Sequence, residues 1–327
     1  MVKPRGLRRE WQRPASPGRQ AASTDLGGPG FDLRLRLREV QSSNDQGVGQ
    51  MSDHNLLLYA SLEASDPACG PAAYALGAAA ALGAQLDVMV PNLDLPFTGH
   101  WEDPSAEELE RESAARQRQV SALAEAIAEA ARARGVQVFT QTAWAHAFGF
   151  LPFLTDRAKL YDLMITGVDR SNFLSEREIA EQALFESGRP VVVVPKQHEL
   201  PFVCSHVTIA WDHSRSAARA LHDALPFLRL AKEIRFVAVG GEKRFQTNPD
   251  RQIIELAMRQ KGLDVRFEQI ELGEKSIGQA LQAYALEGGA DLLVMGAYGH
   301  SRLREFLLGG ATREILDNPR LPVLLSH

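Results

Sequence analysis

The feature that most constrains this chain is a repeated alternation of short apolar runs with helical stretches along residues 51–327. Such an alternation predicts parallel sheets with helices on both faces. The apolar runs are continuous rather than alternating, which is typical of strands buried on both sides. In the first half the expected strands are Leu56–Ala60, Ala84–Val90, Val136–Gln141, Asp162–Thr166 and Pro190–Val194. The expected helices open after Asp66-Pro67 and after Asp103-Pro104, and cover Phe150–Ala158 and Ser175–Ser187.

The second half repeats the order of the first. Its expected strands are His206–Trp211, Ile234–Val239, Val265–Ile270, Asp291–Met295 and Pro322–Leu325. Its expected helices begin at Ser214, at Asn248-Pro249, at Ser276 and at Gly309. Two anchors align between the halves, an Asp-Leu pair before the fourth strand and a Pro-Val pair in the fifth. The chain is therefore expected to hold two domains, residues 51–200 and 201–327.

Residues 1–50 differ from the rest in composition and charge. Nine basic and five acidic residues give this segment a charge of +4, so a net charge of −5 leaves −5 − 4 = −9 for the remainder. A segment rich in Gly, Pro, Ser and Gln buries too little apolar surface to offset its ordering entropy. We expect a disordered basic tail. The alternating stretch that starts at Phe31 could form a strand, but no partner strand lies nearby in the sequence.

The origin of this segment stays open. It lacks the apolar run of a secretory signal. It could be an Arg-rich transit peptide, or it could precede a natural start at Met51, and we favour the second interpretation.

Composition excludes several classes of protein. Apolar residues make up 45% of the chain, but no run reaches the ~18 residues that span a bilayer. The two cysteines, Cys69 and Cys204, are too few for a disulfide scaffold or a Cys-rich zinc module. The negative net charge argues against general nucleic-acid binding. The histidines are scattered, and no hydrolytic, phosphate-loop or zinc motif is present. We expect a cytoplasmic protein without a metal site, membrane contact or nucleic-acid partner.

The most informative stretch runs from Gly296 through Gly299 to Gly309 and Gly310, after a buried strand and before a helix. Glycines allow close backbone approach to a ligand, and a helix start favours phosphate. Basic residues in and after the stretch would add positive charge; they are His300, Arg302, Arg304 and Arg313. An ordinary strand-to-helix turn is the alternative.

Asp212 ends the first strand of the second half, so it is expected at the same sheet edge as the glycine stretch. Its carboxylate could accept hydrogen bonds from a ribose hydroxyl or an exocyclic amine. It could equally cap the helix at Ser214. Trp211, just before it, is expected to pack against a helix rather than to stack on a base.

Together, Asp212, the Gly-x2-Gly-x9-Gly spacing and the closing Pro-Val strand resemble the universal stress protein family. The resemblance covers residues 51–327 as a tandem two-domain member. It implies flavodoxin-like, Rossmann-like domains, each a five-stranded parallel sheet in the order 3-2-1-4-5. It also implies an adenine-nucleotide site in the second domain. The implied site residues are Ala210, Trp211, Asp212, Met295, Gly296, Gly299, His300, Gly309, Gly310, Ala311 and Thr312.

The chain departs from the family pattern in two places. Nucleotide-binding members carry Ser or Thr where this chain has Gly310, so one hydroxyl donor is absent, and Thr312 lies two residues on. The first half departs further and is expected to be structural. Ser61 replaces the aspartate, Arg170 replaces the second glycine, and Ala180 and Glu181 stand where the closing Gly-Ser would be.

The resemblance implies a stress-response protein that binds ATP, with ADP or AMP as alternatives, and regulates a protein partner that the sequence does not identify. A nucleotide-free dimerisation scaffold is the alternative, and a nucleotide-hydrolysing or adenylating enzyme is the less favoured one. The two apolar closing strands are expected to meet in an intramolecular pseudo-dimer, since either would otherwise be an exposed edge. A further homodimer is compatible with this arrangement.

Overall fold

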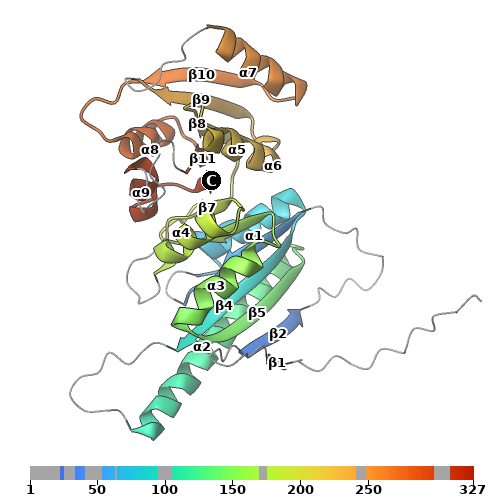
Figure 1. The fold of residues 1–327 in the computed structure, drawn as a ribbon. Coiled ribbons are helices and arrows are strands. Elements are labelled where there is room, and N and C mark those ends of the chain that lie inside the picture. The colour runs from blue at the N-terminus through green and yellow to red at the C-terminus, as the bar shows by residue number, and fades with distance from the viewer. Residues whose placement is uncertain are drawn as a thin grey trace, which may run out of the picture.

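The computed structural model describes residues 23–25, 34–40, 54–62, 65–94, 105–168, 175–240, 248–297 and 310–327. Within these residues, twelve strands form one sheet in the order β1-β2-β5-β4-β3-β6-β7-β12-β11-β8-β9-β10 (Figure 1). The strands are β1 (Ser23–Asp25), β2 (Arg34–Val40), β3 (Asn55–Tyr59), β4 (Gln85–Asp94), β5 (Val138–His146), β6 (Leu163–Thr166), β7 (Val191–Val193), β8 (His206–Ala210), β9 (Glu233–Val239), β10 (Val265–Ile270), β11 (Leu292–Gly296) and β12 (Val323–Ser326). The helices are α1 (Gly70–Leu82), α2 (Ala106–Ala133), α3 (Ala147–Ala158), α4 (Glu176–Glu186), α5 (Arg215–Asp223), α6 (Leu225–Leu228), α7 (Asn248–Gln260), α8 (Ile277–Glu287) and α9 (Gly310–Asp317).

The two halves have the same sheet topology. In the first half the order β5-β4-β3-β6-β7 places the strands as 3-2-1-4-5, and every neighbouring pair is parallel. In the second half β10-β9-β8-β11-β12 repeats that order with parallel pairs. The predicted fold class, two flavodoxin-like α/β units with parallel sheets, is confirmed.

The closing strands of the two halves join them into one sheet. β7 and β12 pair antiparallel, with Val192 opposite Leu324. Each strand thereby covers the edge that the other would expose, as the sequence led us to expect. Helices α4 and α9 lie next to each other across this seam, where Arg177 Nε is 2.7 Å from an oxygen of Asp317. The seam is therefore apolar in the sheet and charged between the helices.

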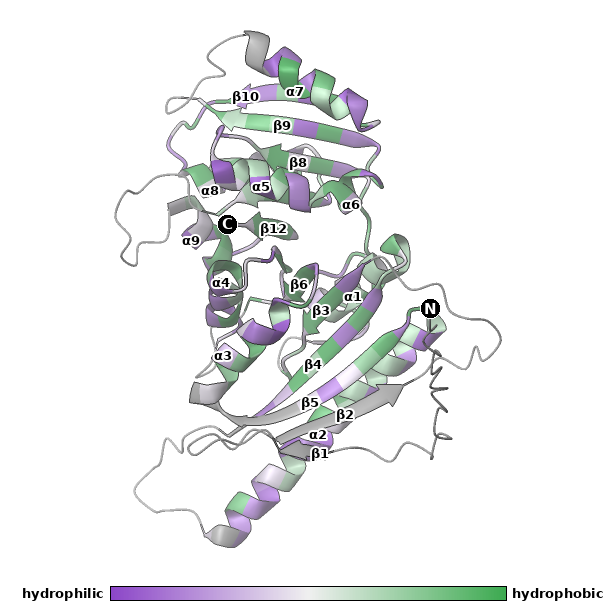
Figure 2. Cartoon of the chain, turned by 45° about the vertical axis from the view of Figure 1, so that its right-hand side comes forward, coloured by the Kyte–Doolittle hydropathy of each residue, from purple (hydrophilic) through white to green (hydrophobic). Residues whose placement is uncertain are grey.

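The core consists of two apolar layers, one on each face of the sheet. One layer packs residues of α1, α2, α5, α6 and α7 against the strands. The other packs residues of α3, α4, α8 and α9. Successive strand residues alternate between the layers, so that Leu56 and Leu58 face one and Leu57 and Tyr59 the other. This explains why the central strands β6 and β12 are mainly apolar, whereas the outer strands β9 and β10 also carry hydrophilic residues (Figure 2). No helix in the described ranges is both long and apolar enough to cross a membrane.

Most helix ends follow the predicted signals. Ser175 caps α4 with a capping box that includes Glu178, and Gly135 after α2 has φ +68°. Two expectations need correction. Helix α1 begins at Gly70 with a proline in its first turn, because Asp66 instead accepts a hydrogen bond from Ala68 N–H in a preceding turn. Helix α2 begins after Ser105, which is its N-cap.

The expectation of a wholly disordered tail is wrong for part of residues 1–50. Residues 34–40 form β2, which pairs antiparallel with β5 from Arg34 opposite Trp144 to Val40 opposite Val138. Residues 23–25 form β1 on the outer side of β2. The partner strand is distant in sequence, so the local pattern could not reveal it. The remainder of this segment lies outside the described residues.

Candidate functional site

Two neighbouring strands of the second half, β8 and β11, end together at the carboxyl edge of the sheet. They are parallel, with Ile209 opposite Val294. The sheet continues from β8 to β9 on one side and to β11 on the other, so the direction of the crossovers reverses between β8 and β11. Open parallel sheets bind ligands beyond the strand ends at such a switch point.

Asp212 lies just beyond the end of β8 and supports the start of α5. Its Oδ1 accepts a hydrogen bond from Ser214 N–H at 2.9 Å. Ser214 caps α5, since its Oγ accepts from Ala217 N–H at 3.0 Å. His213, between them, has φ 61°. The capping role that the sequence left open is therefore present, and a carboxylate offers about four acceptor sites, so capping leaves room for ligand hydrogen bonds.

Ala210 and Trp211 carry the chain from β8 to Asp212. The Trp211 ring meets Phe236 of β9 with centroids 5.6 Å apart and 67° between the planes. Its Nε1 is 3.3 Å from Nδ1 of His213. The expectation that Trp211 packs rather than stacks on a base agrees with these contacts, although its partner is a strand residue instead of a helix.

Gly296 ends β11 and touches the first turn of α5. A Cβ at this position would lie 2.4 Å from the backbone nitrogen of Ala217 and 2.5 Å from the carbonyl carbon of Ser216. Close packing of β11 against α5 therefore explains this glycine without a ligand. The preceding Met295 is buried in the core, so only its backbone could meet a ligand.

Helix α9 starts at Gly310, and its direction places this start at the carboxyl edge, because β11 and β12 are parallel. A Cβ on Gly310 would meet none of the described residues within 4 Å. Thr312, in contrast, is 2% exposed and cannot present its hydroxyl in place of the missing one. Ala311, between Gly310 and Thr312, is partly buried. Gly299, His300 and Gly309 lie outside the described residues.

In the first half, a carboxyl side chain lies at the corresponding part of the carboxyl edge, between the ends of β3 and β6 and the start of α4. Glu176, the first residue of α4, is 4% exposed, and Ser61 Oγ donates a hydrogen bond to its Oε1. A Cβ on Gly167 would lie 2.5 Å from Oε2 of Glu176. Ser61 occupies the strand position of Asp212, and Gly167 that of Gly296. In the first half the buried carboxyl group of Glu176 therefore lies between these two positions.

The packing of the two helices corrects one correspondence between the halves. They bury matching positions, which are Ala180, Ala183 and Leu184 in α4 and Thr312, Ile315 and Leu316 in α9. On this spacing Arg177 and Glu178 stand opposite Gly309 and Gly310, rather than the predicted Ala180 and Glu181. The first half therefore offers no glycine at the helix start.

Sequence reasoning missed Glu176, although the sequence carries a signal for it. The capping pair Ser175 and Glu178 predicts a helix that starts at residue 176. Ile179 and Ala180 lie three and four positions further on and are buried, so residue 176 belongs to the same helix face. A carboxylate on a buried face at a helix start needs an internal donor.

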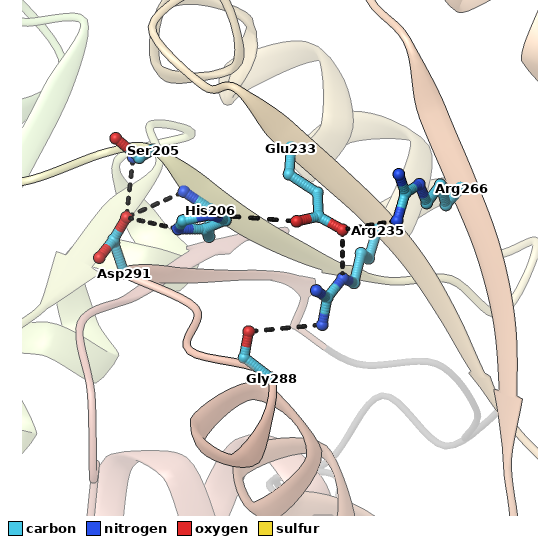
Figure 3. Close-up of polar contacts among 7 residues, drawn as sticks. All are labelled: Ser205, His206, Glu233, Arg235, Arg266, Gly288 and Asp291. Atoms are coloured by element: carbon cyan, nitrogen blue, oxygen red, sulfur yellow. Dashed lines mark hydrogen bonds and ion pairs between the residues drawn. The ribbon is translucent and has the colours of Figure 1, made fainter.

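The repeated aspartates before the fourth strands lie at the opposite, amino edge of the sheet. Asp291 Oδ2 accepts hydrogen bonds from Ser205 N–H at 2.8 Å and His206 N–H at 2.9 Å (Figure 3). Asp162 accepts from Asn55 N–H at 2.9 Å in the first half. These aspartates fasten the start of the fourth strand to the start of the first, so their role is structural.

A charged cluster at this amino edge includes Glu233, Arg235 and Arg266 (Figure 3). Arg235 Nε donates to Glu233 at 2.8 Å, and Arg266 lies 3.3 Å from the same oxygen. The hydrogen bond from Arg235 is the main cause that lowers the pKa of Glu233. Because this cluster lies across the sheet from Asp212, it forms no part of the candidate site.

The cysteines offer no reactive centre. Burial raises the pKa of Cys204 to about 12. Burial and the nearby Asp66 carboxylate raise the pKa of Cys69. The residues that the structure describes contain no cluster of His, Cys, Asp and Glu that could hold a metal ion.

Known proteins resemble this chain at the level of family and fold. The family model described as "Universal stress protein family" matches residues 205–327. A universal stress protein of Synechocystis sp. is 32% identical over 149 residues, which are 44% of this chain and 49% of the relative. The chain thus spans about half the length of that relative.

Two solved structures complete the comparison. A universal stress protein from Archaeoglobus fulgidus has a TM-score of 0.60 at 17% identity, covering 83% of this chain and 97% of its own. It shows that nearly the whole chain shares one fold with that protein. A universal stress protein solved in complex with cAMP is 21% identical and covers 38% of this chain and 97% of its own, with a TM-score of 0.29.

Proposed function

Because the universal stress protein family model matches residues 205–327, we propose that the chain is a member of this family and that its second half binds an adenine nucleotide. ATP is the proposed ligand, and ADP and AMP would compete for the same place. The protein would act as a regulatory binding module, in which the bound nucleotide changes the surface presented to a partner.

One observation carries the proposal, namely the contrast between the starts of α4 and α9. Both helices begin at the carboxyl edge of their sheet, where N–H groups without helical partners favour an anion. In the first half Glu176 brings a carboxylate to this edge. In the second half the helix opens with Gly310, where a Cβ would meet none of the described residues within 4 Å. In the proposed complex, the phosphates of the ligand occupy in the second half the region that Glu176 occupies in the first.

The roles of individual residues follow from their chemistry. Asp212 would accept hydrogen bonds from a ribose hydroxyl or the adenine amine. The backbone at Gly296 and at the start of α9 would meet the phosphates. The segment that contains Gly299, His300 and Gly309 would complete the phosphate contacts. None of these roles requires a metal ligand or a general base.

Titration calorimetry with ATP tests the proposal. Asp212→Asn keeps an oxygen that can accept from Ser214 N–H, so the start of α5 is retained, but it removes the charge. We expect the Kd to rise tenfold or more, since a hydrogen bond to a charged group contributes about 1.5–3 kcal/mol. Asp66→Asn is the matched control, because Asp66 makes the same kind of turn in the first half. This variant should bind like the wild type.

Other results would contradict the proposal. If the wild type gave no heat at millimolar ATP, the protein would be a nucleotide-free scaffold, a second function that the β7–β12 pairing supports. If Asp66→Asn weakened binding as much as Asp212→Asn, the site would lie in the first half. Steady release of phosphate from ATP would indicate an enzyme.

A further inference from the structure

The two ends of the sheet are protected in different ways. β5 and β10 are the third strands of their halves and occupy equivalent positions. In the described part of the chain β10 ends the sheet, and its exposed Arg266 and Glu268 place charges along it. Charged side chains on an edge strand oppose pairing with another chain. β10 therefore carries its own protection.

β5 has no such charges. Its sequence, Val-Phe-Thr-Gln-Thr-Ala-Trp-Ala-His, contains no Asp, Glu, Lys or Arg, and no Gly or Pro. Several of its residues are β-branched or aromatic, which favours extended structure. Neutral segments of this kind, when they lie at a sheet edge, pair readily with other chains. Without β2, the edge of β5 would therefore be open to pairing with a strand of another chain.

β2 covers this edge along most of its length. The antiparallel register runs through seven residue pairs, from Arg34 opposite Trp144 to Val40 opposite Val138. The sequence of β2, Arg-Leu-Arg-Leu-Arg-Glu-Val, holds four charged residues in seven. The short β1 then pairs with the first part of β2. Beyond the neutral third strand β5 the sheet thus continues with the charge-rich β2, the first part of which pairs in turn with β1.

We propose that residues 34–40 are an edge cap and that the strand edge which they cover is a self-association surface. With the cap in place, the first half resembles the second half, because charged residues belong to the strand at its end of the sheet. When the cap is removed or displaced, β5 of a second copy occupies the edge in an antiparallel pairing. The β7–β12 seam shows that this chain already uses antiparallel pairing of neutral strands to close an edge. Two copies of β5 would bring no like charges together.

The test compares four forms of the protein. They are the wild type, a deletion of residues 1–50, Leu37→Pro and Ser42→Pro. A proline at position 37 interrupts the strand, whereas position 42 lies two residues beyond it. Light scattering after size exclusion measures the mass, and hydrogen exchange measures protection of residues 138–146. We expect the deletion variant and Leu37→Pro to associate, each with a mass about twice that of its own single chain. Ser42→Pro should match the wild type.

Hydrogen exchange distinguishes a local loss of the edge cap from a general loss of stability of the whole protein. In Leu37→Pro at concentrations too low for association, β5 amides should exchange roughly tenfold faster or more, while β10 amides are unchanged. A synthetic peptide of residues 31–42 should return the deletion variant to a single chain and restore the protection of its β5 amides, and a peptide with Leu37→Pro should not. A deletion variant that stays a single chain and keeps the wild-type protection of β5 would overturn the proposal. Equal loss of protection in β5 and β10 would also overturn it.

Discussion

At the scale of single residues, the two halves differ most at the start of the helix that follows the fourth strand. Glu176 fills the first half with a carboxylate held by Ser61. In the second half Glu178, two residues after Glu176, is matched by Gly310, which begins α9 without a side chain. The two helix starts therefore differ in the side chains that they bring to the carboxyl edge. The difference predicts how each half should respond to mutation.

Gly310→Ser should strengthen ATP binding. Among the described residues the new side chain has room, because none of them lies within 4 Å of a Cβ at this position. Its hydroxyl would add a hydrogen bond to a charged phosphate, about 1.5–3 kcal/mol, so the Kd should fall about ten- to hundredfold. Calorimetry against Gly310→Ala isolates the hydroxyl from the added carbon. Equal affinities of the two variants would show that the phosphates lie elsewhere.

Ser61→Ala should destabilise the protein without changing ATP affinity. The substitution removes a donor from the buried Glu176 carboxylate, which should cost about 1.5–3 kcal/mol. Ser65→Ala is the control, since the buried Ser65 hydroxyl has no hydrogen-bond partner among the described residues. That control should change the free energy of unfolding by less than about 0.5 kcal/mol. Denaturant titration measures both, and similar losses in the two variants would contradict the role of Ser61.

At the scale of elements, close contacts between a strand end and a helix start shape the candidate site. Gly296 at the end of β11 touches Ser216 and Ala217 in the first turn of α5. The helix start is held in turn by Ser214 and by Asp212. The proposed ligand contacts therefore rest on a rigid pair of elements. The contact with α5 therefore requires a glycine at position 296 whether or not a nucleotide is bound.

Gly296→Ala should lower stability by about 1–3 kcal/mol, because the added carbon overlaps the backbone of α5 and overpacking costs energy of that order. Gly310→Ala should stay within about 0.5 kcal/mol of the wild type, since its Cβ has room. Thermal unfolding in the absence of ATP measures the difference. If both variants unfolded at the same temperature, the α5–β11 contact would be looser than described.

At the scale of the whole molecule, the β7–β12 seam makes one sheet from two similar halves. Val191–Val193 and Val323–Leu325 pair across it, and the ion pair between Arg177 and Asp317 joins α4 to α9. The two apolar layers continue on both faces through strands of both halves. The first half therefore contributes strands and core residues to a sheet that it shares with the second half.

Residues 201–327 expressed alone should form a homodimer through β12. Separation leaves the apolar edge Val323–Ser326 without its partner, and a second copy can provide the same antiparallel pairing. Light scattering would show twice the monomer mass. A soluble, folded monomer over a wide concentration range would mean that β12 does not drive association by itself.

The sequence by itself determined most elements of residues 51–327 and their order, because these depend on local patterns. Continuous apolar runs predicted the buried strands, and Ser175, Ser214 and Ser276 predicted helix starts through their own hydrogen bonds. Asp212 and the glycine stretch were placed at one sheet edge, since carboxyl ends of parallel strands share an edge. These predictions needed no knowledge of distant contacts.

Only the tertiary structure decided what each position touches. Ser61 meets Glu176 across 115 residues of chain, and Gly296 is small because α5 lies against it. β2 is a strand because β5, about a hundred residues further on, has an edge to cover. In each case a residue's environment is supplied by a segment that folding brings alongside it. Local sequence specifies the conformation of a segment, but its neighbours in space arise from packing of the whole sheet.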